Sequence, residues 1–417
     1  MEFIDELIWR GLVKDVTDLD GLRERLKTPA TVYCGFDPTA DSLHVGHMQQ
    51  IMLLKRYQEA GHRVIALCGG ATGMIGDPRP TSERQMQSLD VIKENVEALK
   101  EQLSRFLDLT HNEKGVLLNN YDWLGEIGIL QFLRDYGKHF NVNYMLAKDT
   151  IASRLDTGIS FTEFSYTILQ AMDWLHLYEA ENCEIQIGGS DQWGNLTSGG
   201  ELIRKVLGDK HKVYGITSPL INKADGSKFG KSEGENIWLN TDYTNAYDFY
   251  QFWINTSDSE IIDYMKRLSM KTPAEIMEFE KLVELEPHKR EAQKALAKEL
   301  TLLVHKEAGL ARALNITEVL FGGDIKELAV KDIKAGLKDA PKYHLKDSMN
   351  VVDLLVNAKV ASSKREAREF IKNGAISING DKMQDTNLEV DASLALGDEL
   401  IVVKRGRRNY FIIDLIQ

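Results

Sequence analysis

Short apolar runs alternate with a helical pattern over the first 120 residues of the chain. Residues 30–36 and 64–68 are almost continuously apolar, which is typical of strands buried on both faces of a parallel sheet. Between them, apolar residues recur at helical spacing within residues 48–60. A strand, a helix and a strand within about forty residues form a βαβ unit. With a further strand at 116–120, the pattern predicts an α/β fold built on a parallel sheet.

The remaining chain is mainly helical in pattern, with a few strands. Helical spacing occurs in segments 1–28, 83–108, 122–156, 161–177, 247–254, 259–268, 273–285, 287–308 and 364–372. Strand patterns occur at 184–187 and 376–382, and the Asn-Gly pair in the second predicts a hairpin. The helices between 247 and 308 predict a helical domain, and the glycines and lysines of 321–350 predict a linker with short helices.

The turn after the first strand reads Asp37-Pro38-Thr39-Ala40-Asp41-Ser42-Leu43-His44-Val45-Gly46-His47. A strand-to-helix turn in an open α/β sheet commonly holds a nucleotide, and the helix N-terminus favours phosphate. His44 and His47 are three residues apart and therefore project from one face of the first turn. Gly46 lets a flat ligand approach the backbone. Metal sites also use His-x-x-His pairs, and a histidine at a helix start is often only a cap, so this stretch alone leaves these interpretations open.

Three further segments contain glycines that suit close approach of a ligand. Residues 69–78 contain four glycines, which either bring a ligand close to the backbone or merely connect two elements. Gly188-Gly189 ends a strand, and the polar residues 190–195 open the next helix. Residues 223–232 end in Gly-Lys-Ser, but Asp225 stands where a Walker A loop needs its first glycine. No apolar strand directly precedes this loop and no clear helix follows it, so it is predicted to be a mobile phosphate clamp.

Three polar side chains share one face of the helix predicted at 161–177. Tyr166, Gln170 and Asp173 fall at positions i, i+4 and i+7. A solvated helix face is the ordinary alternative, but such faces usually carry lysine and glutamate. A row of Tyr, Gln and Asp suits hydrogen bonding inside a pocket.

Composition places the chain among ordinary globular proteins. Its 417 residues are 43% hydrophobic, and no run of about 18 apolar residues predicts a membrane span. The first residues carry acids and lack the pattern of a secretory signal. The three cysteines, Cys34, Cys68 and Cys183, form no Cys-x-x-Cys pair, which favours a reducing compartment over disulfides or a cysteine-bound zinc.

Charge is distributed unevenly along the chain. The formal net charge is -12, yet residues 351–417 contain ten basic and ten acidic residues and are neutral. Their basic residues gather on one predicted helix, after the capping box Ser363–Glu366, and on the loop near residue 406. This pattern indicates contact with a phosphate backbone, with a solvated charged face as the alternative.

Taken together, these segments resemble the bacterial-type tyrosyl-tRNA synthetases, a family of class I aminoacyl-tRNA synthetases. The resemblance covers essentially the whole chain. It rests on Tyr33–Thr39, His44-Val45-Gly46-His47, Gly188–Asn195 and Lys228-Phe229-Gly230-Lys231-Ser232. The last of these is similar to the family's KMSKS loop, and the C-terminal segment resembles an S4 RNA-binding domain.

The resemblance implies activation of L-tyrosine by ATP, followed by transfer of tyrosine to the 3′ end of tRNA(Tyr). Thr39, His44, Lys228 and Lys231 would hold charge at the phosphates, and Cys34, His47 and Asp191 would contact the ribose. Tyr33 and Asp173 would bind the phenol hydroxyl, Asp77, Tyr166 and Gln170 the α-ammonium, and Gln192 the carboxyl region. The catalytic set would be Thr39, His44, His47, Gln192, Lys228 and Lys231. Further ATP contacts would be Gly35, Asp37, Gly46, Gly189 and Ser232. The tRNA contacts would be Lys364, Arg365, Arg368, Lys372, Arg405, Arg407 and Arg408.

The resemblance also implies a domain plan and partners. The plan is a Rossmann-like catalytic domain at 1–222, the KFGKS loop and an α-helical anticodon-region domain at 223–322, a linker at 323–350 and an S4-like domain at 351–417. We expect a cytoplasmic homodimer, no membrane partner, and Mg²⁺ that arrives with ATP without a dedicated protein site. One departure is the loop after Asp77-Pro78, where Arg79 or Arg84 stands for a lysine common in the family, or the contact is absent.

Three rival interpretations remain at the level of the sequence. A small HxGH nucleotidyltransferase would share His44 and His47 but would need no S4-like tail. An RNA-binding protein on a synthetase scaffold would have lost some of the catalytic residues, and none is lost here. A tryptophan-specific relative is the closest rival, but such enzymes are usually shorter and lack the S4-like tail.

Overall fold

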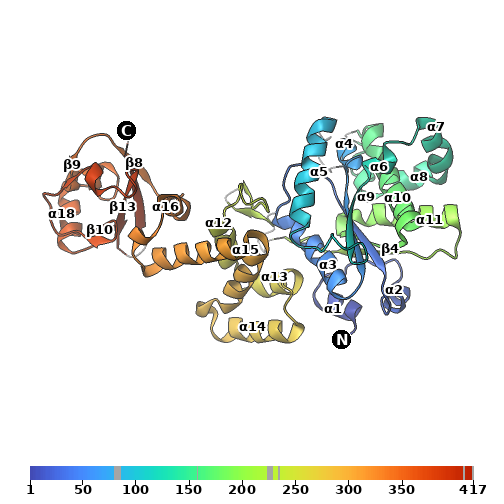
Figure 1. Cartoon of the computed structure of the whole chain (residues 1–417), viewed down its shortest axis with the longest axis horizontal. Coiled ribbons are helices and arrows are strands. Elements are labelled where there is room, and N and C mark those ends of the chain that lie inside the picture. The colour runs from blue at the N-terminus through green and yellow to red at the C-terminus, as the bar shows by residue number, and fades with distance from the viewer. Residues whose placement is uncertain (79–85, 157, 223–228, 233–234, 407–408, 416–417) are drawn as a thin grey trace. The chain divides into compact units, whose positions relative to one another are not determined.

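The computed structural model describes residues 1–78, 86–156, 158–222, 229–232, 235–406 and 409–415 (Figure 1). The chain forms two compact units. Unit 1 consists of residues 1–244 and 252–304, and unit 2 of residues 245–251 and 305–417. No helix among the described residues is long and apolar enough to cross a membrane.

Unit 1 is built on a five-stranded parallel sheet, so the predicted α/β fold is confirmed. Its strands are β1 (Thr31–Phe36), β2 (Arg63–Cys68), β3 (Gly115–Asn119), β4 (Cys183–Gly189) and β5 (Tyr214–Ser218). They lie in the order β3-β2-β1-β4-β5. Most of their side chains are buried because helices cover both faces of the sheet. After β1 the chain first adds strands on one side and later returns to add strands on the other, which creates a topological switch point between β1 and β4.

Four longer helices enclose this sheet. They are α3 (Met48–Glu59) and α5 (Leu89–Leu103) on one face and α10 (Phe161–Glu181) and α11 (Trp193–Leu207) on the other (Figure 1). The helix predicted at 83–108 is shorter, because Ser88 caps its N-terminus and its side chain accepts a hydrogen bond from the Val91 amide. Gly199 allows α11 to pack closely on α10, since a Cβ at this position would lie 2.7 Å from Cε3 of Trp174.

The other helices of this α/β region are short. They are α1 (Phe3–Trp9), α2 (Leu19–Arg25), α4 (Thr72–Ile75), α6 (Tyr121–Leu124), α7 (Ile129–Gln131), α8 (Val142–Leu146) and α9 (Asp149–Ala152). Single helical turns also lead into two of the long helices, as η1 (Val45–His47) before α3 and η4 (Ser190–Gln192) before α11. After Gly230 comes a short antiparallel strand pair, β6 (Lys231–Ser232) with β7 (Glu235–Asn236). A strand pair in place of a helix agrees with the rejection of a Walker A loop.

The helical segment predicted after residue 243 is confirmed. It contains α12 (Ala246–Ile254), α13 (Ile261–Leu268), α14 (Pro273–Leu285) and α15 (Glu291–Gly322). α15 extends well beyond the predicted end at 308. Its backbone is interrupted at Lys306, which has a φ of 61°, and the boundary between the two units falls beside this residue.

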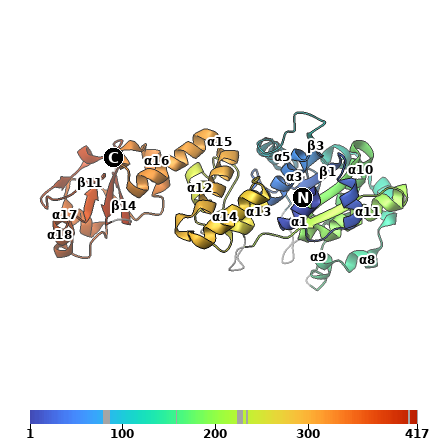
Figure 2. The same ribbon diagram turned by 90° about the horizontal axis from the view of Figure 1, so that it is seen from below.

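Unit 2 contains a second sheet with the strand order β11-β10-β13-β14-β8 (Figure 2). Its strands are β8 (Lys342–Leu345), β10 (Ile376–Ile378), β11 (Asp381–Lys382), β13 (Leu400–Arg405) and β14 (Asn409–Leu415). The predicted hairpin joins β10 to β11, and both turn residues have positive φ, 48° at Asn379 and 91° at Gly380. A small pair of strands, β9 (Met349–Asn350) and β12 (Glu389–Val390), and the helices α17 (Val351–Asn357) and α18 (Lys364–Lys372) complete the C-terminal part.

The stretch expected to be a linker contributes to the core of unit 2. It contains α16 (Val330–Gly336) and β8, and β8 pairs in parallel with β14. Its buried apolar residues pack with those of α15, β13 and β14 in one cluster: Ile316, Val319, Leu320, Ile325, Leu328, Ile333, Leu337, Leu400, Val402 and Ile412. The lysines between these positions give the stretch a polar average, which hid its apolar positions.

Candidate functional site

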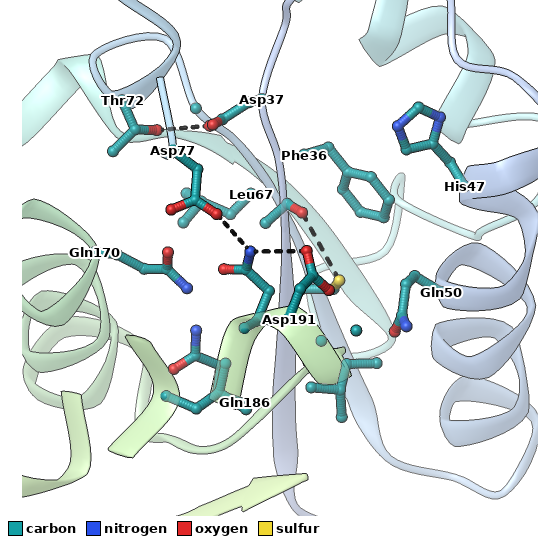
Figure 3. A pocket seen from close by; sticks show the side chains of 18 of the residues that line it. Phe36, Asp37, His47, Gln50, Leu67, Thr72, Asp77, Gln170, Gln186 and Asp191 are labelled. Atoms are coloured by element: carbon teal, nitrogen blue, oxygen red, sulfur yellow. Dashed lines mark hydrogen bonds between the residues drawn. The ribbon is translucent and has the colours of Figure 1, made fainter. Parts of the chain in front are cut away.

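A cavity of about 320 Å³ opens at the carboxyl ends of β1 and β4, at the switch point of the parallel sheet (Figure 3). This is where open α/β sheets bind ligands. Most of the predicted site residues line it: Tyr33, Cys34, Gly35, Asp37, Thr39, Gly46, His47, Asp77, Tyr166, Gln170, Asp173, Gly189, Asp191 and Gln192. Residues that are up to 159 positions apart in the chain therefore meet in one site.

One end of the cavity combines a hydroxyl group with a carboxylate. The side chain of Tyr33 is 1% exposed, and its hydroxyl has no hydrogen-bond partner among the described residues. Asp173 is 2% exposed and accepts hydrogen bonds from Nδ2 of Asn120 (2.9 Å) and Nε1 of Trp123 (2.8 Å). Burial raises the pKa of Asp173 to about 7, although both donors oppose that shift. This end suits a ligand hydroxyl, which can both donate and accept a hydrogen bond.

A second carboxylate, Asp77, belongs to the glycine-rich segment 69–78. Nε2 of Gln192 donates to it at 2.7 Å and Nδ2 of Asn195 at 3.4 Å. Burial raises the pKa of Asp77 to about 6. Nearby, Gln170 points into the cavity, and its side-chain carbonyl oxygen has no partner among the described residues (Figure 3). A carboxylate and an amide oxygen together suit a ligand ammonium group.

Asp37 anchors several elements of the site. Its two carboxylate oxygens accept hydrogen bonds from Oγ1 of Thr72 and from the hydroxyl of Tyr166, each at 2.8 Å. These bonds connect the end of β1 with α4 and α10. Tyr166 is therefore the part of the predicted polar stripe that positions Asp37, while Gln170 and Asp173 face the cavity.

His44 and His47 form a capping arrangement at the start of α3. Nδ1 of His44 accepts from the Gly46 amide at 3.0 Å, and Nδ1 of His47 accepts from the His44 amide at 3.2 Å. The ring centroids are 4.1 Å apart. Because both rings accept at Nδ1, the neutral tautomer carries its hydrogen at Nε2 and can donate to a ligand oxygen there. Burial lowers the pKa of His47 to about 3, so this ring is neutral at physiological pH.

His47 lines the cavity, whereas His44 lies beside it and contacts Trp238, with ring centroids 6.0 Å apart. The strand-like residues around Trp238 join the two motif regions through the backbone. The amide of Val45 donates to the carbonyl of Ile237 (2.9 Å), and the amide of Ile237 donates to that of Gly230 (2.9 Å). Gly230 lies directly against the histidine turn, since a Cβ on it would be 2.9 Å from Cγ2 of Val45. The segment 237–239 therefore connects the histidine turn to the end of the KFGKS loop.

Several predicted residues lie outside the part of the chain that the structure describes. These are Lys228, Arg79, Arg84, Arg407 and Arg408, together with the side chains of Lys231 and Ser232. The described part of the chain contains no group of three or more His, Cys, Asp or Glu side chains placed to hold a metal ion.

Some cavity residues were missed in the sequence. They include Gln50, Leu67, Thr72, Asn120 and Gln186. The sequence could have indicated Gln186, because it is the inward-facing polar residue of a strand in which polar and apolar residues alternate. Its register partner on β1 is Tyr33. Asn120 was also the last residue of a predicted strand, where such sheets gather their ligand-binding side chains.

The predicted tRNA contacts fall on unit 2. The side chains of Lys364, Arg365, Arg368 and Lys372 are exposed on α18. Arg405 is half-buried, because its guanidinium lies over the rings of Phe370 and Phe411 and donates to the carbonyl of Val360. Arg405 therefore also supports the fold of this unit.

Comparison with known proteins gives a consistent result. The family model described as "tRNA synthetases class I (W and Y)" matches residues 25–322, and that described as "Tyrosine–tRNA ligase SYY-like C-terminal domain" matches residues 332–413. The chain is 52% identical to the tyrosine–tRNA ligase of Listeria monocytogenes, covering 99% of this chain and 100% of that one. It is 50% identical to tyrosine–tRNA ligase 2 of Bacillus cereus over the full length of both.

A solved structure supports the same grouping. The C-terminally truncated mitochondrial tyrosyl-tRNA synthetase of Aspergillus nidulans is similar, with a TM-score of 0.67 and 31% identity. The alignment covers 77% of this chain and 94% of that one.

Proposed function

The chain belongs to the tyrosine–tRNA ligases, within the class I tRNA synthetases, and on this premise we propose how its cavity divides the reaction. These enzymes activate L-tyrosine with ATP to give tyrosyl-adenylate and pyrophosphate, and then transfer tyrosine to the 3′-terminal adenosine of tRNA(Tyr). In the first step the tyrosine carboxylate attacks the α-phosphate in line. The protein supplies no covalent nucleophile, so its task is to position the reactants and to stabilise charge.

The single observation that carries the proposal is the buried pair of Tyr33 and Asp173. In our proposal the phenol of the substrate donates to Asp173 and accepts from the partnerless hydroxyl of Tyr33. Phenylalanine would leave both groups buried and unpaired. Tyrosine–tRNA ligases are themselves the standard illustration of this rule, with about 10⁵-fold discrimination and no editing step.

The other polar groups fit the rest of the amino acid. Asp77 and Gln170 would bind the α-ammonium group, and Tyr166 would support them through Asp37. Gln192 donates to Asp77 at 2.7 Å and would orient the carboxyl group toward the nucleotide. Gln186 lies next to Tyr33 on the sheet, and its side-chain oxygen has no partner among the described residues. It would therefore contribute a further contact to tyrosine.

ATP would occupy the side of the cavity nearer to α3. Cys34, Gly35, Asp37, Gly46, Gly189 and Asp191 would border the nucleoside. Thr39, His44, His47, Lys228, Lys231 and Ser232 would hold the phosphates and ribose. Mg²⁺ would arrive bound to the phosphates, since the oxygens of Asp37 and Asp77 already accept hydrogen bonds from protein groups.

The experiment that tests this assignment is amino-acid-dependent exchange between ATP and pyrophosphate, with each of the twenty amino acids offered separately. Exchange with tyrosine alone is expected. Exchange with tryptophan would keep the reaction class and contradict the assignment of Tyr33 and Asp173. Folded protein that exchanges with none of them would contradict the adenylation assignment itself.

The assembly and the tRNA contacts are also proposals. Exposed apolar side chains recur along one stretch of unit 1, which supports a homodimer contact there: Ile129, Leu130, Leu133, Val142, Tyr144, Leu155 and Phe161. Sedimentation equilibrium should give the mass of a dimer, and a monomer at micromolar concentration would contradict it. The exposed cations of α18 support an S4-like tRNA contact by residues 351–417. Because ribosomes consume the charged tRNA, we place the enzyme in the cytoplasm.

A further inference from the structure

His176 stacks on the indole of Trp123, which in turn donates a hydrogen bond to a carboxylate that lines the cavity. Its ring lies 4.3 Å from the indole of Trp123, with an angle of 15° between the planes. His176 is on α10, one turn after Asp173, and Trp123 is on the four-residue helix α6. Nε1 of Trp123 donates to Oδ1 of Asp173 at 2.8 Å. The imidazole of His176 therefore packs on one face of the indole, while the N–H at the edge of the indole binds the carboxylate of Asp173.

Trp123 separates the cavity from a second hollow. Asp173 lines the substrate cavity, whereas Trp123 and His176 line a neighbouring hollow of about 410 Å³. Removing the imidazole would leave the indole facing this space, with two side-chain torsions able to move it off its hydrogen bond to Asp173. The remaining donor to Asp173 would be Asn120, at 2.9 Å.

We propose that His176 is a positioning residue for tyrosine recognition, which acts by stacking on Trp123 and so fixes the indole N–H on Asp173. The proposal rests on the assignment of Asp173 to the phenol of the substrate. It concerns the flat ring of His176 and not its charge. A ring that stacks without titrating should serve equally well.

The consequence of losing the stack follows from the electrostatics of Asp173. Tyr33, Tyr166 and Asp37 are titratable groups that act on this carboxyl, and the N–H donors of Asn120 and Trp123 stabilise its charged form. Losing the indole donor raises the pKa of Asp173. The KM for tyrosine, which rises as this acceptor is protonated, should then begin to rise at a higher pH.

The groups around His176 itself are acidic or neutral. The same hollow is lined by Asp122 on α6, by Glu126 and Tyr136 later in the chain, and by Glu179 on α10. Burial lowers the pKa of His176, and Glu179 and Glu181 oppose that shift. A contribution from a charged imidazole would therefore depend on these carboxylates, and a phenylalanine substitution would abolish it.

The test measures kcat and KM for tyrosine in ATP–pyrophosphate exchange between pH 6 and 9 for the full-length chain. His176→Ala should raise KM at pH 7.5 by about threefold to tenfold, on the scale of an aromatic contact, and leave kcat within about twofold. The pH at which KM rises should increase by about half to one unit. His176→Phe should restore both quantities to those of the wild type. His288→Ala, at an exposed histidine, is the matched control.

Three outcomes overturn the inference. One is an unchanged KM and pH profile in folded His176→Ala. Another is a His176→Phe variant that behaves like His176→Ala, because stacking would then not be the property that matters. The third is an Asp173→Asn variant with normal KM for tyrosine, which would also overturn the proposed tyrosine subsite. If Asp173→Asn raises KM while His176→Ala does not, only the inference about His176 fails.

Discussion

At the scale of single residues, the cavity is marked by buried polar atoms without partners. The hydroxyl of Tyr33 and the side-chain oxygens of Gln170 and Gln186 are all buried and unpartnered among the described residues. An unpaired buried polar group typically costs about 1–3 kcal/mol. The ligand-free site is therefore destabilised where it awaits polar groups of the substrate, which is a common trade between stability and function.

Replacing Gln186 by leucine tests this view. Leucine is similar in size to glutamine but lacks the unpaired oxygen. The melting temperature of the ligand-free Gln186→Leu variant should therefore rise. The KM for tyrosine should increase by about tenfold, on the scale of one lost hydrogen bond. Gln293→Leu is the control for KM, because Gln293 is also buried and its side-chain oxygen also has no partner among the described residues, but it lies on α15, away from the cavity. A normal KM in Gln186→Leu would contradict a role for Gln186 in binding tyrosine.

Single residues were predictable where a motif singled them out. Tyr33, Asp77, Gln170 and Asp173, which the resemblance singled out, all line the cavity, and their binding roles stay predictions. Asn120 and Trp123 were missed because they act on Asp173 from a separate segment, Asn120 from the residue between β3 and α6 and Trp123 from α6 itself. Spacing along one helix or strand contains no information about a partner 50 positions away, which only the folded sheet brings into contact.

At the scale of elements, the histidine turn depends on a neighbour far away in the chain. The segment 237–239 bonds to the turn on both sides, since the amide of Leu239 also donates to the carbonyl of Leu43 at 2.8 Å. Trp238 packs against His44 and Tyr243, and the hydroxyl of Tyr243 donates to Asp41. The turn is thus held in place before ATP arrives, as electrostatic stabilisation of a transition state requires.

Trp238→Ala should therefore slow adenylate formation through His44. We expect the single-turnover rate to fall by about tenfold, less than the roughly 10² expected for His44→Ala, which removes the donor itself. The KM for tyrosine should change little, because the Tyr33 and Asp173 end is not involved. Trp238→Phe, which keeps a ring, should recover most of the rate. Equal loss of rate and of tyrosine affinity would instead indicate a general structural effect.

His62 shows how one buried ring joins α3 to the sheet and makes unit 1 sensitive to acid. Its Nδ1 accepts from the Ala30 amide at 3.2 Å, directly before β1, and burial lowers its pKa to about 4. The unfolded chain, with an ordinary histidine pKa near 6.5, binds this proton more readily. The free energy of unfolding should therefore fall as pH decreases from about 6.5 to 4.

Urea unfolding at pH 7 and pH 5 measures this effect. Between these values His62→Gln, which does not titrate, should lose about 1 kcal/mol less stability than the wild type. His288→Gln, at an exposed histidine, should behave like the wild type. Equal acid sensitivity of the wild type and His62→Gln would contradict the assignment.

Elements were predictable to the extent that one pattern dominated them. The apolar runs of β1 and β2 and the spacing in α10 identified the parallel sheet and its main helix. The sequence predicts a linker at 323–350, because the lysines of this segment conceal widely spaced core residues such as Ile333 and Leu337. The strand β8 within it gains its partner only from β14, about 70 residues later.

At the scale of the whole molecule, the substrate cavity and the proposed tRNA contact belong to different units. Every residue that lines the substrate cavity belongs to unit 1, and the exposed cations of α18 belong to unit 2. A cut before residue 351 would remove Leu400, Val402 and Ile412 from the core that they share with α15 and α16. A cut after Gly322, where the synthetase family match ends, leaves less of that core exposed.

A chain that ends at Gly322 should keep tyrosine-dependent pyrophosphate exchange within about twofold and lose tRNA charging. A full-length variant with Lys364, Arg365, Arg368 and Lys372 changed to glutamine provides the matched test without truncation. It should exchange normally, charge tRNA(Tyr) at least about tenfold more slowly, and show a weaker salt dependence, because fewer counterions are released on binding. Normal charging by either variant would remove unit 2 from the tRNA contact.

In our proposal the phenol of tyrosine binds between Tyr33 and Asp173 at the switch point of the sheet. The most direct measurement is the ratio of kcat/KM for tyrosine to kcat/KM for phenylalanine in pyrophosphate exchange. Tyr33→Phe should lower this ratio by about tenfold and Asp173→Asn by about a hundredfold, the larger loss reflecting the charged acceptor. Tyr57→Phe removes another buried hydroxyl, which lies outside the cavity and has no partner in the described part of the chain, and should leave the ratio unchanged. An unaltered ratio in both cavity variants would contradict the placement of the phenol between Tyr33 and Asp173.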